Sequence, residues 1–134
     1  MKPIKGLAVD GSSRGNPGPS GYKIVNIETN EVLFNIDIGY STNNIAEFIG
    51  LVHALDYAIK NDYDSVYCDS NTAISWANRK VVKTTLTKNE KTTKSLDTMN
   101  RAILHLHKMK NYNKLIKKWE TSLWGESPAD FGLK

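Results

Sequence analysis

The order in which strand-like and helix-like patterns follow one another constrains the fold of this chain most. Three runs of strand character come first, at Ile4–Val9, Gly21–Ile27 and Val32–Ile38, and apolar residues then recur at helical spacing over Ile45–Lys60. The later predicted elements are a strand at Ser65–Cys68, a helix at Thr72–Asn78, a longer helix with an inner stripe from Leu96 to Leu106, a strand at Leu115–Trp119 and a terminal helical turn at Pro128–Gly132. Consecutive strands followed by alternating helices and strands predict an α/β protein, with a mixed sheet flanked by helices.

The length of 134 residues fits one domain, so we expect residues 1–134 to form a single domain. Cys68 is the only cysteine, which excludes an internal disulfide bond and is typical of a reducing compartment. The N-terminus lacks the apolar core of a signal peptide, and no apolar run approaches the roughly 18 residues of a membrane helix. The sequence therefore predicts a cytoplasmic protein that does not associate with membranes, and we expect it to be a monomer.

The net charge of +4 conceals an uneven distribution along the chain. From Arg79 to Lys118 there are twelve Lys and Arg residues against only Glu90 and Asp97, a net charge of +10, whereas the rest of the chain carries −6. One interpretation is an enzyme that grips a polyphosphate with its basic half and holds metal ions with its acidic half. The other is a lysine-rich helix face exposed to solvent, and charge alone does not separate the two.

Two aspartates come directly after predicted strands. Asp10 follows Val9 in the stretch V-D-G-S-S-R-G-N-P-G, and Asp69 follows Cys68. If these strands are neighbours, both carboxylates lie at the rim of the sheet where open α/β folds bind ligands. Two close anions favour a cation between them, so the pair indicates a divalent metal site. The alternative is local for each residue: an Asx-turn or, for Asp69, the N-cap of the next helix.

Glu47 and Asp130 are two further acidic candidates. Glu47 shares its predicted helix stripe with Phe48 and Leu51, so it faces inward near the start of the helix. Its alternative role is a capping box with Asn44, in which the glutamate returns to a backbone N–H group. Asp130, taken alone, is only a negative charge in the first turns of a terminal helix.

Together these four positions resemble the D-E-D-D set of type 1 ribonuclease H, also called ribonuclease HI. They are Asp10 in D-G-S, Glu47 in T-N-N-x-A-E, Asp69 in C-D-S and Asp130 in P-A-D. The resemblance spans nearly the whole chain and covers the catalytic domain only. It implies the ribonuclease H-like fold, a five-stranded mixed sheet flanked by helices. It also implies an endoribonuclease that hydrolyses the RNA strand of RNA–DNA hybrids and leaves 5′-phosphate and 3′-hydroxyl ends.

The same resemblance implies a cofactor of two Mg²⁺ ions, for which Mn²⁺ can substitute. Carboxylates supply the hard oxygen ligands that Mg²⁺ prefers, and two such ions can activate a water and stabilise a leaving oxygen. By resemblance, Asp10 bridges both ions and Asp130 holds the ion that carries the attacking water. Glu47 and Asp69 hold the other ion, and Glu47 also contacts a 2′-hydroxyl group beside the scissile phosphate.

This chain departs from the family at one position. Many members carry a histidine in the loop before the last aspartate, and this chain has no histidine there. The tail W-G-E-x-x-A-D instead resembles a compact bacterial subgroup, in which Glu126 takes a catalytic role near the water-activating metal. The alternative for Glu126 is a glutamate that favours a helix start through the helix dipole. His53, His105 and His107 are interpreted as structural or surface residues.

Short polar side chains match the positions at which the family contacts a hybrid and senses 2′-hydroxyl groups. These residues are Ser13, Gly15, Asn16, Asn43, Asn44 and Asn71. The positions that resemble a pocket for a phosphate of the DNA strand are Thr42, Asn44, Thr84 and Thr85, and those for further backbone contacts are Lys83, Lys118 and Thr121. Trp76 is predicted either to stack on a sugar or base or to pack in the core. For most of the polar residues the alternative is turn formation or capping.

Three rival interpretations concern the class of protein. A hybrid-binding module without catalysis is disfavoured because all four carboxylates are present. A DNA-cleaving relative of the same fold, such as a resolvase or integrase, is disfavoured by the asparagine-rich set and the T-N-N-x-A-E spacing. A fragment of a reverse transcriptase is the third, and the Met1 start leads us to expect a free-standing enzyme instead. Trp119 and Trp124 are assigned to packing, and Cys68 to a buried, unreactive position.

Overall fold

A mixed sheet runs through the computed structural model of the chain, which describes residues 1–130. Its strands within those residues are β1 (Leu7–Ser13), β2 (Gly18–Asn26), β3 (Glu31–Ser41), β4 (Val66–Cys68) and β5 (Ile116–Lys118). Their order across the five-stranded sheet is β3-β2-β1-β4-β5. The first three strands pair antiparallel, whereas β4 runs parallel to both β1 and β5. The predicted fold class, α/β with a five-stranded mixed sheet flanked by helices, is confirmed.

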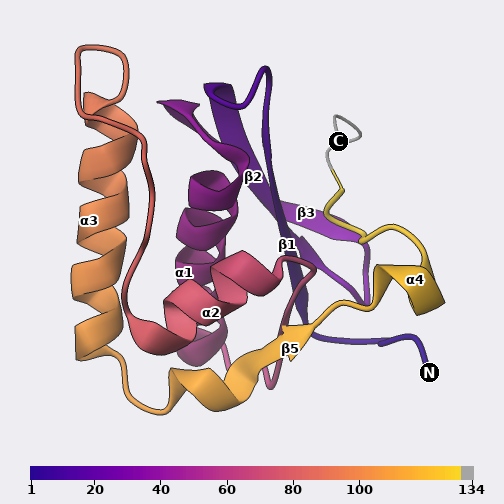
Figure 1. Ribbon diagram of the computed structural model, residues 1–134. Helices are drawn as coiled ribbons and strands as arrows, with labels where there is room; N and C mark the ends of the chain where they lie inside the picture. The colour runs from indigo at the N-terminus through magenta and orange to yellow at the C-terminus, as the bar shows by residue number, and fades with distance from the viewer. Residues whose placement is uncertain (131–134) are drawn as a thin grey trace.

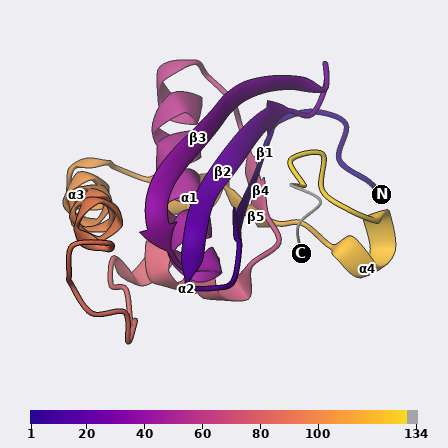
Figure 2. The same ribbon diagram turned by 90° about the horizontal axis from the view of Figure 1, so that it is seen from above.

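Helices cover the sheet unequally. The helical segments within the described residues are α1 (Asn43–Lys60), α2 (Asn71–Arg79), α3 (Thr93–Lys108), a 3₁₀ helix at Tyr112–Leu115 and α4 (Thr121–Trp124). Figure 1 shows the three long helices on one side of the sheet and the short α4 on the other. The view from above in Figure 2 shows α1 against the central strands and α3 beyond the β3 edge. In the part of the chain that is described, no helix combines the length and the apolar character needed to cross a membrane.

Helix α1 is the centre of the core because it packs against β1 and β2 and also against the other two long helices. Its apolar residues Ile45, Phe48, Leu51 and Leu55 are completely buried. The helix begins after Thr42, whose hydroxyl oxygen accepts a hydrogen bond from the N–H of Ile45 at 3.3 Å. The predicted helix at Ile45–Lys60 is therefore confirmed, and it starts two residues earlier.

Two glycines let α1 lie unusually close to the sheet. A Cβ atom on Gly11 of β1 would lie 2.6 Å from the backbone nitrogen of Glu47 and 2.8 Å from its Cγ atom. A Cβ atom on Gly50 of α1 would lie 2.8 Å from Cγ of Tyr22 and 2.9 Å from Cγ2 of Val9. All four distances are too short for a real Cβ atom, so only glycine permits this approach of helix and sheet at either position.

Several boundaries differ from the sequence prediction, and three of the differences affect the ends of the sheet and of the chain. The first strand is Leu7–Ser13 rather than Ile4–Val9, because Ile4 is 79% exposed and the strand continues through its antiparallel pairing with β2. The last strand is shorter than Leu115–Trp119, since a 3₁₀ turn takes up its beginning. The terminal helical turn expected at Pro128–Gly132 is not a helix in its described part: Pro128 and Ala129 form a hydrogen-bonded turn that ends at Asp130, and residues 131–132 lie outside the described part.

Candidate active site

Asp10 and Asp69 occupy corresponding places on the neighbouring parallel strands β1 and β4. The pairing of these strands ends at Val9 opposite Cys68, and each aspartate is the next residue of its strand or of the loop that follows. The strand after β1 is β2 on one side, whereas the strand after β4 is β5 on the other side, so the strand order changes direction between β1 and β4. Such a switch point opens a crevice at the carboxyl ends of the strands. The prediction that the two strands are neighbours and share one rim is confirmed.

Glu47 adds a third carboxylate from the first turns of α1. One oxygen of each of Asp10, Glu47 and Asp69 lies within 4.8 Å of the other two. Asp10 is 1% exposed and Glu47 3%, while Asp69 is half-buried. Gly11, directly after Asp10, makes room for the backbone of Glu47 and so allows the helix to deliver this side chain. The structure thus brings together three of the four predicted carboxylates.

The capping alternatives for these carboxylates are wrong. Helix α1 is capped by Thr42, which lies outside the capping box proposed for Asn44 and Glu47. Helix α2 is capped by Ser70, whose hydroxyl oxygen accepts a hydrogen bond from the N–H of Ala73 at 3.1 Å, and not by Asp69. Neither helix start therefore accounts for the acidic residue next to it.

The negative charge of the site affects the pKa of the neighbouring Cys68 thiol. Cys68 is 1% exposed, and burial raises the pKa of its thiol well above the ordinary range. The negative charges of Glu47, Asp69 and Asp10 raise this pKa further. The thiol therefore stays protonated, in agreement with its predicted role as a small buried group.

The donor set fits a divalent metal ion. Three carboxylates offer hard oxygen ligands at one point, two of them are almost completely removed from solvent, and together they concentrate negative charge. A cation of high charge density compensates such a group better than water does, and Mg²⁺ typically binds through one or two carboxylates plus phosphate oxygens. Asp10, Glu47 and Asp69 are the residues that could hold such an ion.

The C-terminal segment approaches β1 from the side opposite α1. Ala129 is fully buried against Ala8 and Val25, so Asp130 follows a residue that is packed on the strand of Asp10. Its backbone N–H donates a hydrogen bond to the carbonyl of Ser127 at 3.0 Å. Among residues 1–130 the group of mutually close carboxylates does not extend to Asp130. Glu126 is exposed and also lies outside this group.

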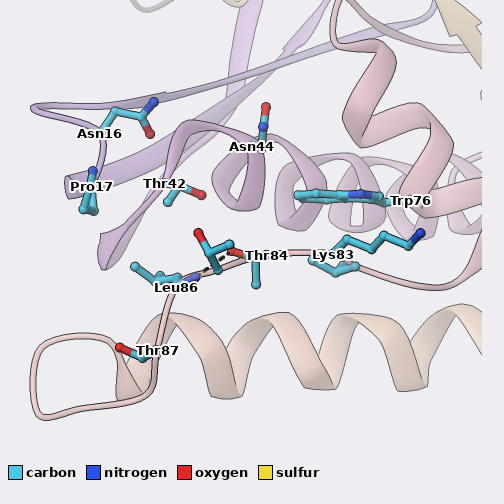
Figure 3. A pocket seen from close by; sticks show the side chains of 11 residues that line it. Asn16, Pro17, Thr42, Asn44, Trp76, Lys83, Thr84, Leu86 and Thr87 are labelled. Carbon is cyan, nitrogen blue, oxygen red and sulfur yellow. Dashed lines mark hydrogen bonds between the residues drawn. The ribbon is translucent and has the colours of Figure 1, made fainter.

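A groove begins beside the first turn of α1. It has a volume of about 900 Å³ and is bounded by the β1–β2 turn, the start of α1, α2 and the extended chain after α2. Its lining residues are Asn16, Pro17, Thr42, Asn44, Trp76, Val82, Lys83, Thr84, Thr85, Leu86 and Thr87. Figure 3 shows the hydroxyl groups of Thr42 and Thr84 on facing walls, with Asn44 beyond them. The four residues predicted for a phosphate pocket, Thr42, Asn44, Thr84 and Thr85, therefore line one groove.

The other predicted contact residues are placed less uniformly. Lys83 lines the groove, and Figure 3 shows its side chain running below the ring of Trp76. Asn16 lines the groove and also accepts a hydrogen bond from the N–H of Asn43 at 2.9 Å, which links the β1–β2 turn to the start of α1. Lys118 donates a hydrogen bond to the backbone carbonyl of Asp69. The Lys118 side chain is therefore positioned by the loop that carries one of the carboxylates.

Six predicted contact residues do not line the groove: Asn43 and Lys118, described above, and Ser13, Gly15, Asn71 and Thr121. The hydroxyl of Ser13 donates to the carbonyl of Ser41 at 3.1 Å, which ties β1 to the end of β3. Gly15 has a φ of 90° in the β1–β2 turn, where glycine is favoured. Asn71 and Thr121 are the first residues of α2 and α4. Pro17, Val82, Leu86 and Thr87 line the groove without having been predicted, because no local pattern marks a loop residue that borders a distant helix.

The tryptophan side chains pack against other aromatic residues. Trp119 is fully buried, and its indole N–H donates a hydrogen bond to the carbonyl of Gly125 at 2.9 Å. Its ring packs edge-on against that of Trp124, with 5.1 Å between the ring centroids. Trp76 both lines the groove and packs edge-on against Phe48, so its two predicted roles are compatible.

The three histidines lie away from the carboxylate cluster. His53 forms a 2.7 Å hydrogen bond with the hydroxyl of Tyr22, and burial lowers the pKa of its ring. His105 pairs with Asp56 at 2.8 Å, between α3 and α1, and His107 is exposed. The prediction that they are structural or surface residues agrees with these positions.

Comparison with known sequences gives a match over most of the chain. A family model described as RNase H matches residues 5–121. The bifunctional protein Rv2228c of Mycobacterium tuberculosis is 47% identical over 58 residues. That alignment covers 40% of this chain and 16% of the relative, so the chain spans only a small part of the curated relatives it matches.

Comparison with solved structures also finds RNase H proteins. LC11-RNase H1, solved in complex with an RNA/DNA hybrid, is 25% identical with a TM-score of 0.54, and the match covers 87% of this chain and 86% of that one. The RNase H domain of PFV, solved in solution, is 18% identical with a TM-score of 0.51, covering 99% and 87% of the two chains. The second likeness concerns the fold alone.

Proposed function

Because this chain belongs to the RNase H family, we propose that it is an endoribonuclease that hydrolyses the RNA strand of RNA–DNA hybrids. The observation that carries the proposal is the group of three carboxylates, whose oxygens lie within 4.8 Å of one another. One turn of α1 separates Glu47, in this group, from Asn44, in the groove. The solved complex of LC11-RNase H1 with an RNA/DNA hybrid supports the same substrate for this chain.

We propose that Asp10, Glu47 and Asp69 hold Mg²⁺, or Mn²⁺ in its place, and that Asp130 completes a site for two ions. When bound, such ions supply Lewis-acid stabilisation of a phosphoryl oxygen and a water of lowered pKa. The chain keeps bulk water away from these proposed ligands, since two of the carboxylates are almost fully buried. Attack by water rather than by the 2′-hydroxyl group would leave 5′-phosphate and 3′-hydroxyl ends.

The groove is proposed to bind the backbone of the DNA strand. Threonine hydroxyls and asparagine amides from two walls offer short neutral donors, and these suit phosphate and sugar oxygens without discriminating against a sequence. The family's recognition of RNA is proposed to come from Ser13, Gly15, Asn16, Asn43, Asn44 and Asn71, through contacts with 2′-hydroxyl groups in the minor groove.

The decisive experiment uses one 5′-labelled RNA in three forms: single-stranded, paired to RNA and paired to DNA, each with Mg²⁺ or with EDTA. We expect metal-dependent cleavage confined to the RNA–DNA hybrid, because only this duplex presents 2′-hydroxyl groups on one strand alone. Hybrid binding without cleavage would identify a binding module instead, and cleavage of a DNA strand would indicate a different nuclease activity of the same fold.

Replacing Glu126 by alanine tests the auxiliary catalytic role proposed for this exposed side chain. We expect turnover to fall about 10²-fold, the usual scale of proton-transfer assistance, while hybrid affinity changes little. Single-turnover cleavage rates and hybrid affinities measured in Ca²⁺ separate the two effects. Glu28→Ala, at another exposed glutamate in the β2–β3 turn, is the matched control. An unchanged rate for Glu126→Ala would contradict the auxiliary catalytic role of this residue.

The salt dependence of hybrid binding tests the basic segment from Arg79 to Lys118. Each lysine that contacts a phosphate adds about one unit to the slope of log affinity against log salt concentration, because it displaces a counterion. We expect Lys83→Met to lower this slope by about one unit and Lys5→Met, outside the segment, to leave it unchanged. Fluorescence anisotropy between roughly 50 and 200 mM KCl measures both, and a flat dependence in the unmodified protein would contradict the assignment.

A further inference from the structure

Lys23 is a cation placed opposite an acidic residue of the candidate active site. The register of β1 and β2 pairs Lys23 directly with Asp10. Directly opposite residues of an antiparallel pair point to the same face of the sheet, with Cβ atoms about 4.5–5.5 Å apart. A lysine side chain bridges that distance easily, so its ammonium group can reach the carboxylate of Asp10.

The face that Asp10 and Lys23 share is the one covered by the C-terminal segment. Two residues away on the same strands, Ala8 pairs with Val25, and both are buried under Ala129. Asp130 directly follows Ala129, so the C-terminal carboxylate approaches the sheet beside the same pair of strands. Lys23 therefore lies where the proposed second metal site, between Asp10 and Asp130, would form.

The surroundings of Lys23 on this face single out Asp10 as its nearest acidic neighbour in the sheet. Its partner on β3 is Asn35, which is neutral. Asp37 is the other acidic residue on that side, but it is exposed, lies diagonally on β3 and accepts a hydrogen bond from the N–H of Gly39 at 2.8 Å. Lys23 itself is half-buried, which keeps its charge less screened than that of a surface lysine.

We propose that Lys23 is a positioning residue that balances the charge of Asp10 and competes with a divalent cation on the Asp10–Asp130 side of the site. This inference rests on the proposed metal-dependent function. A fixed positive charge beside a ligand carboxylate repels an incoming divalent cation and shares the charge that the cation would neutralise. Lys23 thereby lowers the affinity of the site for a divalent cation, and the effect acts through Asp10.

The test is calorimetric titration of the free protein with Mn²⁺ alone, which does not depend on catalysis. We expect Lys23→Met to bind Mn²⁺ about tenfold more tightly, because methionine keeps the apolar stem and removes the charge. Lys23→Arg keeps the charge and should retain the affinity of the unmodified protein. Lys60→Met removes an equal charge from the far end of α1, about 20 Å along the helix from Glu47, and should also change nothing.

A double-variant comparison assigns the effect to Asp10. In an Asp10→Asn background, Lys23→Met should no longer increase Mn²⁺ affinity, because the carboxylate that the two cations share is gone. Equal or weaker Mn²⁺ binding by Lys23→Met in the otherwise unmodified protein would overturn the proposal, as would an equal gain from Lys60→Met. Tighter binding by Lys23→Met in a protein that cleaves no hybrid would support this inference while refuting the proposed function.

Discussion

Asp69→Asn is expected to lower the rate of RNA-strand hydrolysis on the order of 10³-fold while hybrid affinity changes less than about threefold. The asparagine amide keeps the size of the side chain but replaces an anionic oxygen ligand with a neutral one, which holds Mg²⁺ poorly. Asp69 is half-buried and contributes an oxygen to the three-carboxylate group, whereas the groove is lined by other residues. Single-turnover cleavage, together with anisotropy in Ca²⁺, measures the two quantities separately.

Asp64→Asn is the matched control for this prediction. Asp64 is an exposed aspartate at the opposite end of β4, two residues before Val66, so its substitution removes the same charge away from the carboxylates. Its cleavage rate should equal that of the unmodified protein. If Asp69→Asn also cleaved at the normal rate, Asp69 would not be a metal ligand, and the three-carboxylate group would need another explanation.

Gly11→Ala is expected to lower cleavage about 10²-fold or more even though it changes no polar group. The added methyl group would lie 2.6 Å from the backbone nitrogen of Glu47, so the start of α1 must move away from β1. This movement separates the carboxylate of Glu47 from that of Asp10. Overpacking of this kind also costs about 1–3 kcal/mol in the free energy of unfolding. Denaturant titration measures the stability, and cleavage rates and Mn²⁺ calorimetry measure the site.

Gly50→Ala separates the loss of stability from the loss of the site. It forces α1 away from Tyr22 and Val9 by a similar clash, but one turn beyond Glu47 on the helix. We expect a comparable decrease in stability and, below the unfolding transition, a cleavage rate that remains within about tenfold of the unmodified value. Equal rates for the two variants would show that Gly11 serves only the general packing of α1.

The positions of Asp10 and Asp69 could be predicted from the sequence because each is marked by a local pattern. Asp10 and Asp69 each follow an apolar run, and the prediction needed only one non-local assumption, that β1 and β4 are neighbours. The pairing of Val9 with Cys68 confirms it. The inward-facing position of Glu47 was also predictable, since helical periodicity places it on the stripe of Phe48 and Leu51. The fold class followed from the order of the elements for the same reason.

What the sequence did not predict depends on contacts between distant segments. Thr42 rather than Asn44 caps α1. The chain leaves β3 only at Ser41, and the geometry of the turn after it decides which side chain reaches the first N–H groups of the helix. The first strand runs past Asp10 because β2 pairs with it as far as Ser13, which no local pattern around V-D-G-S-S indicates. The opposition of Lys23 and Asp10 likewise requires the register, and a shift by one residue would put the two on opposite faces.

The three carboxylates are held by elements of very different length. Asp10 lies within the seven-residue β1, Glu47 in the 18-residue α1, and Asp69 at the end of the three-residue β4, which pairs on its other side with the equally short β5. Short paired segments can open by local fluctuations that cost less free energy than global unfolding, so we expect amide hydrogens around Asp69 to exchange sooner than those in the middle of α1. A bound ion or hybrid adds its binding energy to the closed form alone. Substrate and metal would therefore add stability to the short β4, whose three residues directly precede Asp69.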